Sequence, residues 1–376
     1  MANIYKTESD DWKAVIELGR DKNNKRLRKI KRFKFKKDAI KWATEIEKEK
    51  NDGLIIETSE LTFIDFAKRW LINHKKPKIA ASTFREYKRK IHNEFTPFFS
   101  DLELQQINPL HIETYFNSLR KRELSENTIK KHYVQLNNIF KRAIQLRLIK
   151  YNPITAIEPP KPEKKEAPVL SENEYTKLLR TIKDDFDFFA FIATILFTGL
   201  RRSEILGLEW EDTDLESGVL FIRKRYVHGE NGYIHEEKTK TESSRRKIKM
   251  PDNLVAILKR YKKSQLENQL KLGQIYNNDI DFVFRKPNGD VYHPKYYNDK
   301  FNEYLDIAGL SQKFTLHSLR HTFATINMKN NIKPKVVQEM LGHSTISTTL
   351  DIYSHVDINM QEEAMKKINN LIDTIN

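Results

Sequence analysis

A proline-rich segment divides the chain into two parts and constrains its fold more than any other feature. Residues 152–168, NPITAIEPPKPEKKEAP, contain five of the twelve prolines. Proline fixes its backbone angle and has no N–H to donate, so this composition favours a stiff, extended linker. SENE at 171–174 follows with the pattern of a capping box, which predicts the start of a helix. We therefore predict a linker at 157–168 and a final domain at 169–376.

Before the linker, the hydrophobic pattern changes once. Within 1–56, apolar residues alternate along 12–18 and again at Phe33 and Phe35, as in strands, and the segment 36–50 has helical spacing. Within 57–156, apolar residues repeat at helical spacing in four segments. The predicted starts of three of these four helices are a cap at Ser82, the pair Asn108-Pro109 and Ser125.

The part after the linker mixes helical patterns with one β segment. VLFIRKRYV at 219–227, a glycine-containing turn and RRKIKM at 245–250 predict a small antiparallel sheet. The predicted fold class is therefore multidomain α+β and mainly helical. It comprises a three-stranded sheet plus helix at 1–56, a helical domain at 57–156 and a mixed α/β domain after the linker.

The charge of the chain indicates an anionic partner. Lys and Arg outnumber Asp and Glu by 67 to 52, and residues 20–37 hold eleven basic residues with one acid, Asp21. Such a cluster favours nucleic-acid binding over an evenly solvated surface, although a solvated basic hairpin would have the same composition. The candidate DNA-binding residues of this patch are Lys25, Arg26, Arg28, Lys29, Lys31, Arg32 and Lys34.

Composition also excludes several classes of protein. The chain has no cysteine, so it forms no disulfide and no thiolate metal site, and it fits a reducing compartment. No apolar run approaches the ~20 residues of a membrane span, and the first residues have no apolar signal segment. We therefore expect no membrane partner.

Four stretches of the final domain carry candidate chemistry. TGLRRSEILGLEW at 198–210 places an arginine between two helices, and Arg201 or Arg202 could point inward. HSLRH at 317–321 places His317 and Arg320 on one side of a helix. His317 and His321 have the spacing of a zinc pair, but the residue after His317 is serine, where metalloproteases have glutamate, so we expect no metal site.

The other two stretches add a histidine, a tyrosine and lysines. LGHSTISTTLDIYSH at 341–355 contains His343 and Tyr353, and KTKTESSRRKIKM at 238–250 is a basic turn before a predicted strand. Arginines bind phosphodiester oxygens bidentately, tyrosine can be a covalent nucleophile, and lysine or histidine can protonate a leaving alkoxide. With no credible metal site, these cations would have to stabilise the transition state themselves.

These stretches strongly resemble the tyrosine recombinase (integrase) family, and the resemblance spans nearly the whole chain. It implies that Tyr353 is the nucleophile and selects Arg201 over Arg202 as the catalytic arginine. The family's lysine corresponds best to Lys240, with Lys238 as the alternative. The catalytic residues implied by the resemblance are Arg201, Lys240, His317, Arg320, His343 and Tyr353.

The resemblance also implies a mechanism and partners. Tyr353 would attack a DNA phosphate to form a 3′-phosphotyrosyl link, and a 5′-hydroxyl of a second duplex would reverse the step without a cofactor. Residues 57–156 resemble the SAM-like core-binding domain, and 1–56 resemble the arm-type DNA-binding domain of integrases of phages and conjugative elements. The implied partners are double-stranded DNA at core and arm sites, three further protomers in a tetramer, and accessory directionality or DNA-bending proteins. The implied location is the bacterial cytoplasm, at the nucleoid.

The sequence leaves open the placement of its C-terminal tail and two alternative functions. Residues 358–376 have one apolar helical stripe, which could dock on a neighbouring protomer or pack on its own domain. A DNA-binding regulator without chemistry would share the basic charge and helical domains. A topoisomerase-like enzyme would use the same tyrosine chemistry to relax a single duplex.

Overall fold

A computed structural model describes residues 2–20, 26–51, 60–162, 167–229, 232–236 and 245–352. The chain forms two compact units, Met1–Glu163 and Lys164–Asn376. The boundary between them along the sequence falls within the predicted linker. Five predicted features lie outside the described residues: the turn at 21–24, Lys25, the two candidate lysines, Tyr353 and the tail at 358–376. Within the described ranges, none of the helices has the length and apolar character needed to cross a membrane.

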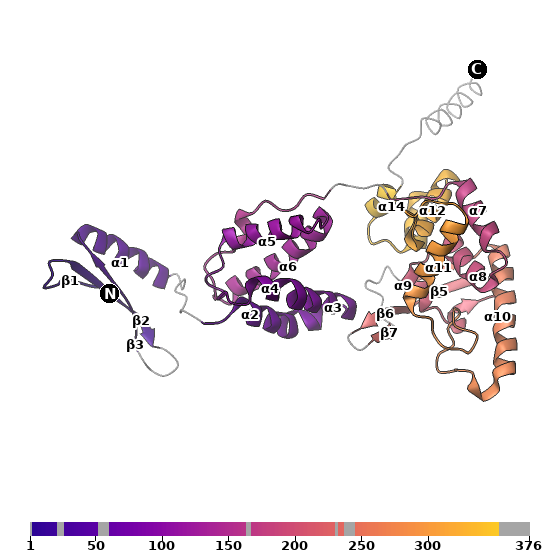
Figure 1. The fold of residues 1–376 in the computed structure, drawn as a ribbon, viewed down its shortest axis with the longest axis horizontal. Helices are drawn as coiled ribbons and strands as arrows, with labels where there is room; N and C mark the ends of the chain where they lie inside the picture. The colour runs from indigo at the N-terminus through magenta and orange to yellow at the C-terminus, as the bar shows by residue number, and fades with distance from the viewer. Residues whose placement is uncertain are drawn as a thin grey trace, which may run out of the picture. The chain divides into compact units, whose positions relative to one another are not determined.

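The N-terminal module is a meander of three antiparallel strands with one helix (Figure 1). β1 is Asn3–Lys6, β2 is Trp12–Arg20, β3 is Arg26–Phe33 and α1 is Lys36–Asn51. Ile16 of β2 packs against Ala43 and Ile46 of α1 in a small core. β3 ends at Phe33, so the predicted alternation does not extend to Phe35, whose side chain is exposed.

The described residues 60–162 of the first unit are mainly helical. Two of its helices begin as predicted, because Asn108 and Ser125 accept hydrogen bonds from the backbone N–H groups of His111 and Thr128. The predicted cap at Ser82 is wrong, since α3 begins at Ala81 and its N-cap is Ala80, two residues before Ser82. The helical elements are α2 Phe63–Trp70, η1 Leu71–Lys75, η2 Lys76–Lys78, α3 Ala81–Lys90, η3 Ile91–Phe95, α4 Thr96–Phe99, α5 Pro109–Lys121, α6 Glu126–Gln145 and η4 Pro153–Ala156.

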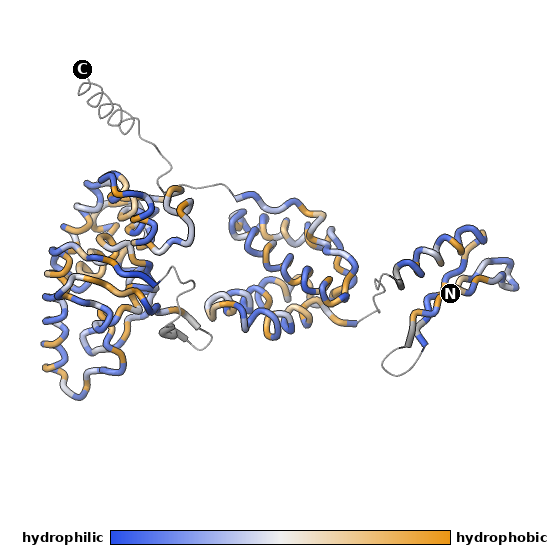
Figure 2. Tube along the Cα trace, turned by 180° about the vertical axis from the view of Figure 1, so that it is seen from behind, coloured by the Kyte–Doolittle hydropathy of each residue, from blue (hydrophilic) through white to orange (hydrophobic). Residues whose placement is uncertain are grey.

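Figure 2 shows apolar and polar residues interspersed along these helices, and the buried residues of α2, α5 and α6 recur at helical spacing. The core of the bundle is aromatic: Phe63 is fully buried and its ring contacts those of Phe95, Phe99 and Phe140. This cluster is separate from the core of the second unit.

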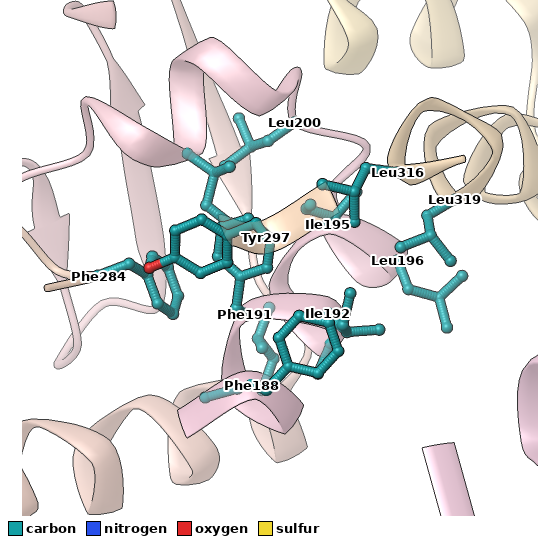
Figure 3. Packing of buried hydrophobic residues seen from close by; sticks show 14 of the residues in the cluster. Phe188, Phe191, Ile192, Ile195, Leu196, Leu200, Phe284, Tyr297, Leu316 and Leu319 are labelled. Atoms are coloured by element: carbon teal, nitrogen blue, oxygen red, sulfur yellow. The ribbon is translucent and has the colours of Figure 1, made fainter. Parts of the chain in front are cut away.

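The second unit is built around one buried helix, α8 (Phe186–Thr198). It packs against α7 (Glu172–Ile182), α10 (Asp252–Leu272) and α12 (Leu316–Lys329). The ring of Phe191 stacks on that of Tyr297 at 3.9 Å between centroids, and Leu319 lies beside Leu196 (Figure 3). The other helices of this unit are α7 Glu172–Ile182, α9 Arg202–Leu206, η5 Trp210–Asp212, α10 Asp252–Leu272, η7 Gly273–Ile275, α11 Pro294–Ile307, α12 Leu316–Lys329, α13 Pro334–Leu341 and α14 Ile346–Ile352.

The predicted single sheet is two sheets. β4 (Thr213–Asp214), β5 (Val219–Ile222) and β8 (Arg246–Lys249) form one antiparallel sheet in that order. β6 (Arg225–Gly229) and β7 (Gly232–Glu236) pair as a separate hairpin. The sequence pattern predicts one continuous β segment over 219–227. In the structure this segment is interrupted at Arg223 and Lys224, which belong to neither sheet.

Candidate active site

The first predicted motif turns sharply where α8 ends. Gly199 caps the helix in the left-handed conformation at φ 66°. A Cβ atom there would lie 2.5 Å from the Phe323 ring and 2.7 Å from the Leu341 side chain, so only glycine fits. Leu200 is buried, and Arg201 then becomes the N-cap of α9. The turn therefore delivers Arg201 to a point where α12 and α13 approach α8.

Arg201 points toward the third motif, whereas Arg202 is exposed. Nη1 of Arg201 donates to Oε1 of Glu204 at 2.7 Å, and Nη2 donates to the carbonyl oxygen of Gly342 at 2.9 Å. The Arg201 side chain keeps 34% of its surface exposed, so the guanidinium is fixed but still accessible. Its remaining N–H groups are available to an anion.

Arg320 lies deepest in the site and is 1% exposed. Its Nη1 donates to the carbonyl oxygen of Gly199 at 2.6 Å, and its Nη2 donates to that of Leu341 at 2.7 Å. Burial, with the nearby charge of Arg201, lowers the pKa of Arg320 to about 9, which leaves it protonated at neutral pH. Arg320 thus joins the C-terminal ends of α8 and α13, where carbonyl groups favour a cation.

Glu204 and Arg246 complete the site and were missed in the sequence. The two side chains are 4% and 6% exposed, and Arg246 donates to both carboxylate oxygens of Glu204 at 3.2 and 2.8 Å. Nε of Arg246 also donates to the carbonyl oxygen of Met340 at 2.6 Å. Burial by itself would raise the pKa of Glu204, but Arg246, Arg201 and Arg320 together lower it to about 2. Glu204 is therefore ionised and holds two arginines.

Both missed residues had a signal in the sequence. Glu204 lies three residues after Arg201, the spacing of a capping box, and its carboxylate does accept from the Arg201 backbone N–H at 2.9 Å. Arg246 alternates with Ile248 and Met250, which are buried, so strand periodicity places it on the inner face. Neither signal identifies the partner 42 residues away.

The pKa values of three histidines near the arginines are lowered, which favours their neutral forms. Burial, with the charges of Arg320 and Arg201, lowers the pKa of His317, although part of its ring reaches solvent. Burial also lowers the pKa of His321 to about 4 and that of His343 to about 3. The rings of His317 and His321 meet edge to face, 4.5 Å apart. Neutral histidines can donate or accept hydrogen bonds at a phosphate.

His343 also connects the site to the segment before Tyr353. Gly342 ends α13 in the left-handed conformation at φ 64°, and the next residue turns inward. Nδ1 of His343 and the hydroxyl of Thr349 on α14 are hydrogen bonded at 2.9 Å, and Thr349 is fully buried. α14 ends at Ile352, the residue before Tyr353. Tyr353, Lys238 and Lys240 lie outside the described residues.

Four of the predicted residues therefore come together: Arg201, His317, Arg320 and His343. With Arg246, three guanidinium groups surround the single carboxylate of Glu204, which leaves an excess of positive charge. Such a site can bind a phosphodiester and stabilise the extra negative charge of its transition state.

Comparison with known proteins identifies the family. Residues 168–360 match the family model described as "Phage integrase family", and residues 62–120 match the "Phage integrase, N-terminal SAM-like domain". The chain belongs to the phage integrase family. This confirms the predicted family, the mainly helical multidomain fold and a tyrosine recombinase of the integrase type.

Relatives of this family member match it along nearly its full length. A XerC-like tyrosine recombinase of Caldanaerobacter subterraneus subsp. tengcongensis is 29% identical over 98% of each chain. The ICEBs1 integrase of Bacillus subtilis is 22% identical over 98% of this chain and 100% of its own. Among solved structures, the integrase of transposon Tn1549 in complex with transposon right end DNA superposes with a TM-score of 0.70. It has 22% identity and covers 82% of this chain and 100% of that one.

Proposed function

We propose that this chain is a site-specific tyrosine recombinase that integrates and excises a mobile genetic element. The observation that carries the proposal is that the partly exposed Arg201 lies close to the buried Arg320. The ends of α8 and α13 hold both arginines, and two neutral histidines lie beside them. A site with this excess of positive charge suits a reaction in which a phosphate gains negative charge.

The proposed reaction conserves the energy of the phosphodiester bond. The hydroxyl of Tyr353 passes its proton to a neutral histidine, His317 or His343, as its oxygen attacks the phosphorus. The bond to the 5′ oxygen breaks, and a 3′-phosphotyrosyl link forms. Arg201 and Arg320 bind the non-bridging oxygens, while His317 and His343 hydrogen-bond the same phosphate. Lys240 gives a proton to the departing 5′ oxygen. A 5′-hydroxyl from a second duplex then attacks the link and releases the tyrosine.

The proposed partner is double-stranded DNA, bound by a tetramer at core sites and by the N-terminal module at arm sites. The exposed basic residues of β3, among them Arg28, Lys31 and Arg32, support an arm-site contact. A solved structure supports the assembly. It is a lambda integrase tetramer bound to a Holliday junction, and its chain superposes on this one with a TM-score of 0.57. Accessory proteins would set the direction, and the reaction would take place in the bacterial cytoplasm, at the nucleoid.

The decisive experiment uses a nicked suicide DNA that carries the ends of the element. We expect a protein–DNA adduct that resists denaturation, and we expect Tyr353→Phe to abolish it while DNA binding persists. An adduct that survives Tyr353→Phe would mean a different nucleophile. Sound binding without any adduct would favour a DNA-binding regulator, and relaxation of a single duplex without exchange would favour a topoisomerase.

A matched pair of variants tests the arginine assignment. Arg201→Ala should lower the rate of adduct formation by about 10²–10³, the usual effect of removing one donor to a transition-state oxygen. Arg202→Ala removes the same charge from the exposed neighbour and should leave the rate within a factor of about two of wild type. Equal losses in the two variants would contradict the assignment.

The lysine assignment needs a substrate with a better leaving group. A DNA whose bridging 5′ oxygen is replaced by sulfur releases a thiolate, which needs no proton from the enzyme. Lys240→Ala should therefore be defective on ordinary DNA and recover on the sulfur-containing DNA. If Lys238→Ala shows this recovery instead, Lys238 is the general acid.

A further inference from the structure

A basic groove lies on the β4–β5–β8 sheet, next to the arginine site. It has a volume of about 430 Å³, and its lining includes Phe221, Arg223, Arg245 and Lys247. Arg246 lines the groove as well, and its guanidinium binds Glu204. Since Glu204 also binds Arg201, a single ion-pair network connects the groove to the arginine proposed to bind the reacting phosphate.

The strand pairing explains why the charges gather there. Phe221 and Lys247 are direct cross-strand partners, and so are Leu220 and Ile248. Leu220 and Ile248 are buried in the core, so their neighbours Phe221 and Lys247 face outward. The Phe221 ring then lies under two cations, with Arg223 at 5.0 Å and Lys247 at 5.3 Å from its centre. Both contacts have the geometry of cation–π pairs, which restrain the two long side chains.

The charges of the groove are only partly neutralised. Arg223 pairs with the buried Asp212 at 2.9 Å, and Lys224 pairs with Glu209 and Glu211, both at 2.8 Å. Within the ranges that the structure describes, no carboxylate forms an ion pair with Arg245 or Lys247, and both residues are exposed. Two cations thus remain beside a restrained arginine, a combination that suits a phosphate group.

Another role could explain these charges without a ligand. β8 is an edge strand of the three-stranded sheet, and charged residues on an edge strand discourage pairing with another chain. That role requires charge of either sign at 245 and 247. Phosphate binding requires positive charge, so the two roles predict different results for a reversal of charge.

We propose that this groove binds a backbone phosphate of duplex DNA outside the reacting phosphate, through Arg245, Lys247 and Arg223. The proposal rests on the proposed function for its choice of DNA as the anion. Equilibrium binding tests it, because binding needs no strand cleavage and can succeed or fail independently of the chemistry.

The experiment measures the affinity of the full chain for a labelled DNA duplex of arbitrary sequence between about 50 and 200 mM salt. Each phosphate contact contributes about 0.9 to the slope of log K against log salt. Arg245→Ala/Lys247→Ala should therefore bind more weakly and show a slope smaller by about 1.8. As a control, Lys263→Ala/Lys271→Ala removes two exposed charges from α10 and should leave the slope unchanged.

The charge-reversed variant Arg245→Glu/Lys247→Glu separates the two roles. This variant keeps charged residues on the edge strand. Its affinity for DNA should therefore equal that of wild type if the charges only prevent strand pairing. It should bind more weakly than the alanine variant if they contact phosphate. An unchanged slope in the alanine variant, or equal slope losses in it and the α10 control, would overturn the proposal. A cooperative unfolding transition at the wild-type midpoint excludes misfolding as the cause.

Discussion

At the scale of single residues, Glu204 holds the arginines of the site in place. It is the only carboxylate that the described structure places among Arg201, Arg246 and Arg320, and it is nearly fully buried. Its ionised form neutralises part of a cluster that would otherwise repel itself. The stability of this unit therefore depends on a charge that also orients the proposed phosphate-binding arginine.

Replacing Glu204 by Gln should be strongly destabilising. The variant leaves Arg246 buried without its ionic partner, and breaking a buried ion pair costs about 3–5 kcal/mol. Denaturant unfolding of the second unit measures the change. Glu339→Gln removes an exposed carboxylate paired with Lys335 and should cost less than about 1 kcal/mol. Similar losses in both variants would contradict this account.

The low pKa of Glu204 predicts that the free energy of unfolding decreases in acid. The pKa of Glu204 is about 2 in the folded chain and lies below its ordinary value of 4.5, so the unfolded chain binds its proton first. Its contribution is complete above about pH 4.5 and is lost as the pH falls toward 2. Between pH 5 and 3, wild type should therefore lose more stability than Glu204→Gln. Parallel pH profiles for the two proteins would contradict the low pKa.

His343 predicts a dependence in a different pH range. Burial and the adjacent arginines lower its pKa from 6.5 to about 3, so the folded chain resists its protonation. Stability is then lost as the pH falls below 6.5, because the unfolded histidine takes up a proton first. In NMR spectra the His343 ring resonances should stay constant from pH 8 to pH 5. A titration midpoint near 6.5 would contradict the buried, neutral ring.

At the scale of elements, the helix ends were the most predictable features. The caps at Asn108, Ser125 and Ser171 depend on residues three positions apart, so a local pattern is sufficient to find them. The sheet was harder, because β5 pairs with β8 across a separate hairpin. A local alternation of apolar residues does not reveal where one strand stops and another begins.

In the candidate site, too, local arrangements were predictable and long-range contacts were not. His317 and Arg320 are predictable as neighbours because they lie on one helix. Their approach to Arg201 and His343 depends on how α8, α12 and α13 pack, and only the family resemblance predicted it from the sequence. The Glu204–Arg246 pair depends on the same packing, and the resemblance had drawn no attention to it.

The turn after α8 gives a prediction at this scale. Gly199→Ala should destabilise the second unit by about 2–4 kcal/mol, because it adds a clash with Phe323 and Leu341 to the strain of the left-handed backbone. Gly309→Ala is the matched control: its φ is 57°, an added Cβ would meet only the Lys177 Nζ at 3.7 Å, and it should cost only about 1–2 kcal/mol. Calorimetry compares the two, and equal losses would mean that crowding is unimportant.

At the scale of the whole molecule, the two separate cores predict two separate unfolding events. Phe63→Ala removes the centre of the aromatic cluster in the first unit and should cost that unit about 3–5 kcal/mol. Phe191→Ala should do the same to the second unit. Calorimetry of each variant should show one transition shifted and the other unchanged. A shift of both transitions by either variant would mean that the units unfold together.

Arg201 and Arg320 each donate a hydrogen bond to a backbone carbonyl group at the end of α13, that of Gly342 and that of Leu341. Any opening of the last turn of α13 therefore releases two guanidinium groups at once. Conversely, an anion that holds the guanidiniums in place must oppose that opening. Binding of DNA should then slow hydrogen exchange at the amides that close this turn, including those of Gly342 and His343, which donate to the carbonyl groups of Glu339 and Gln338.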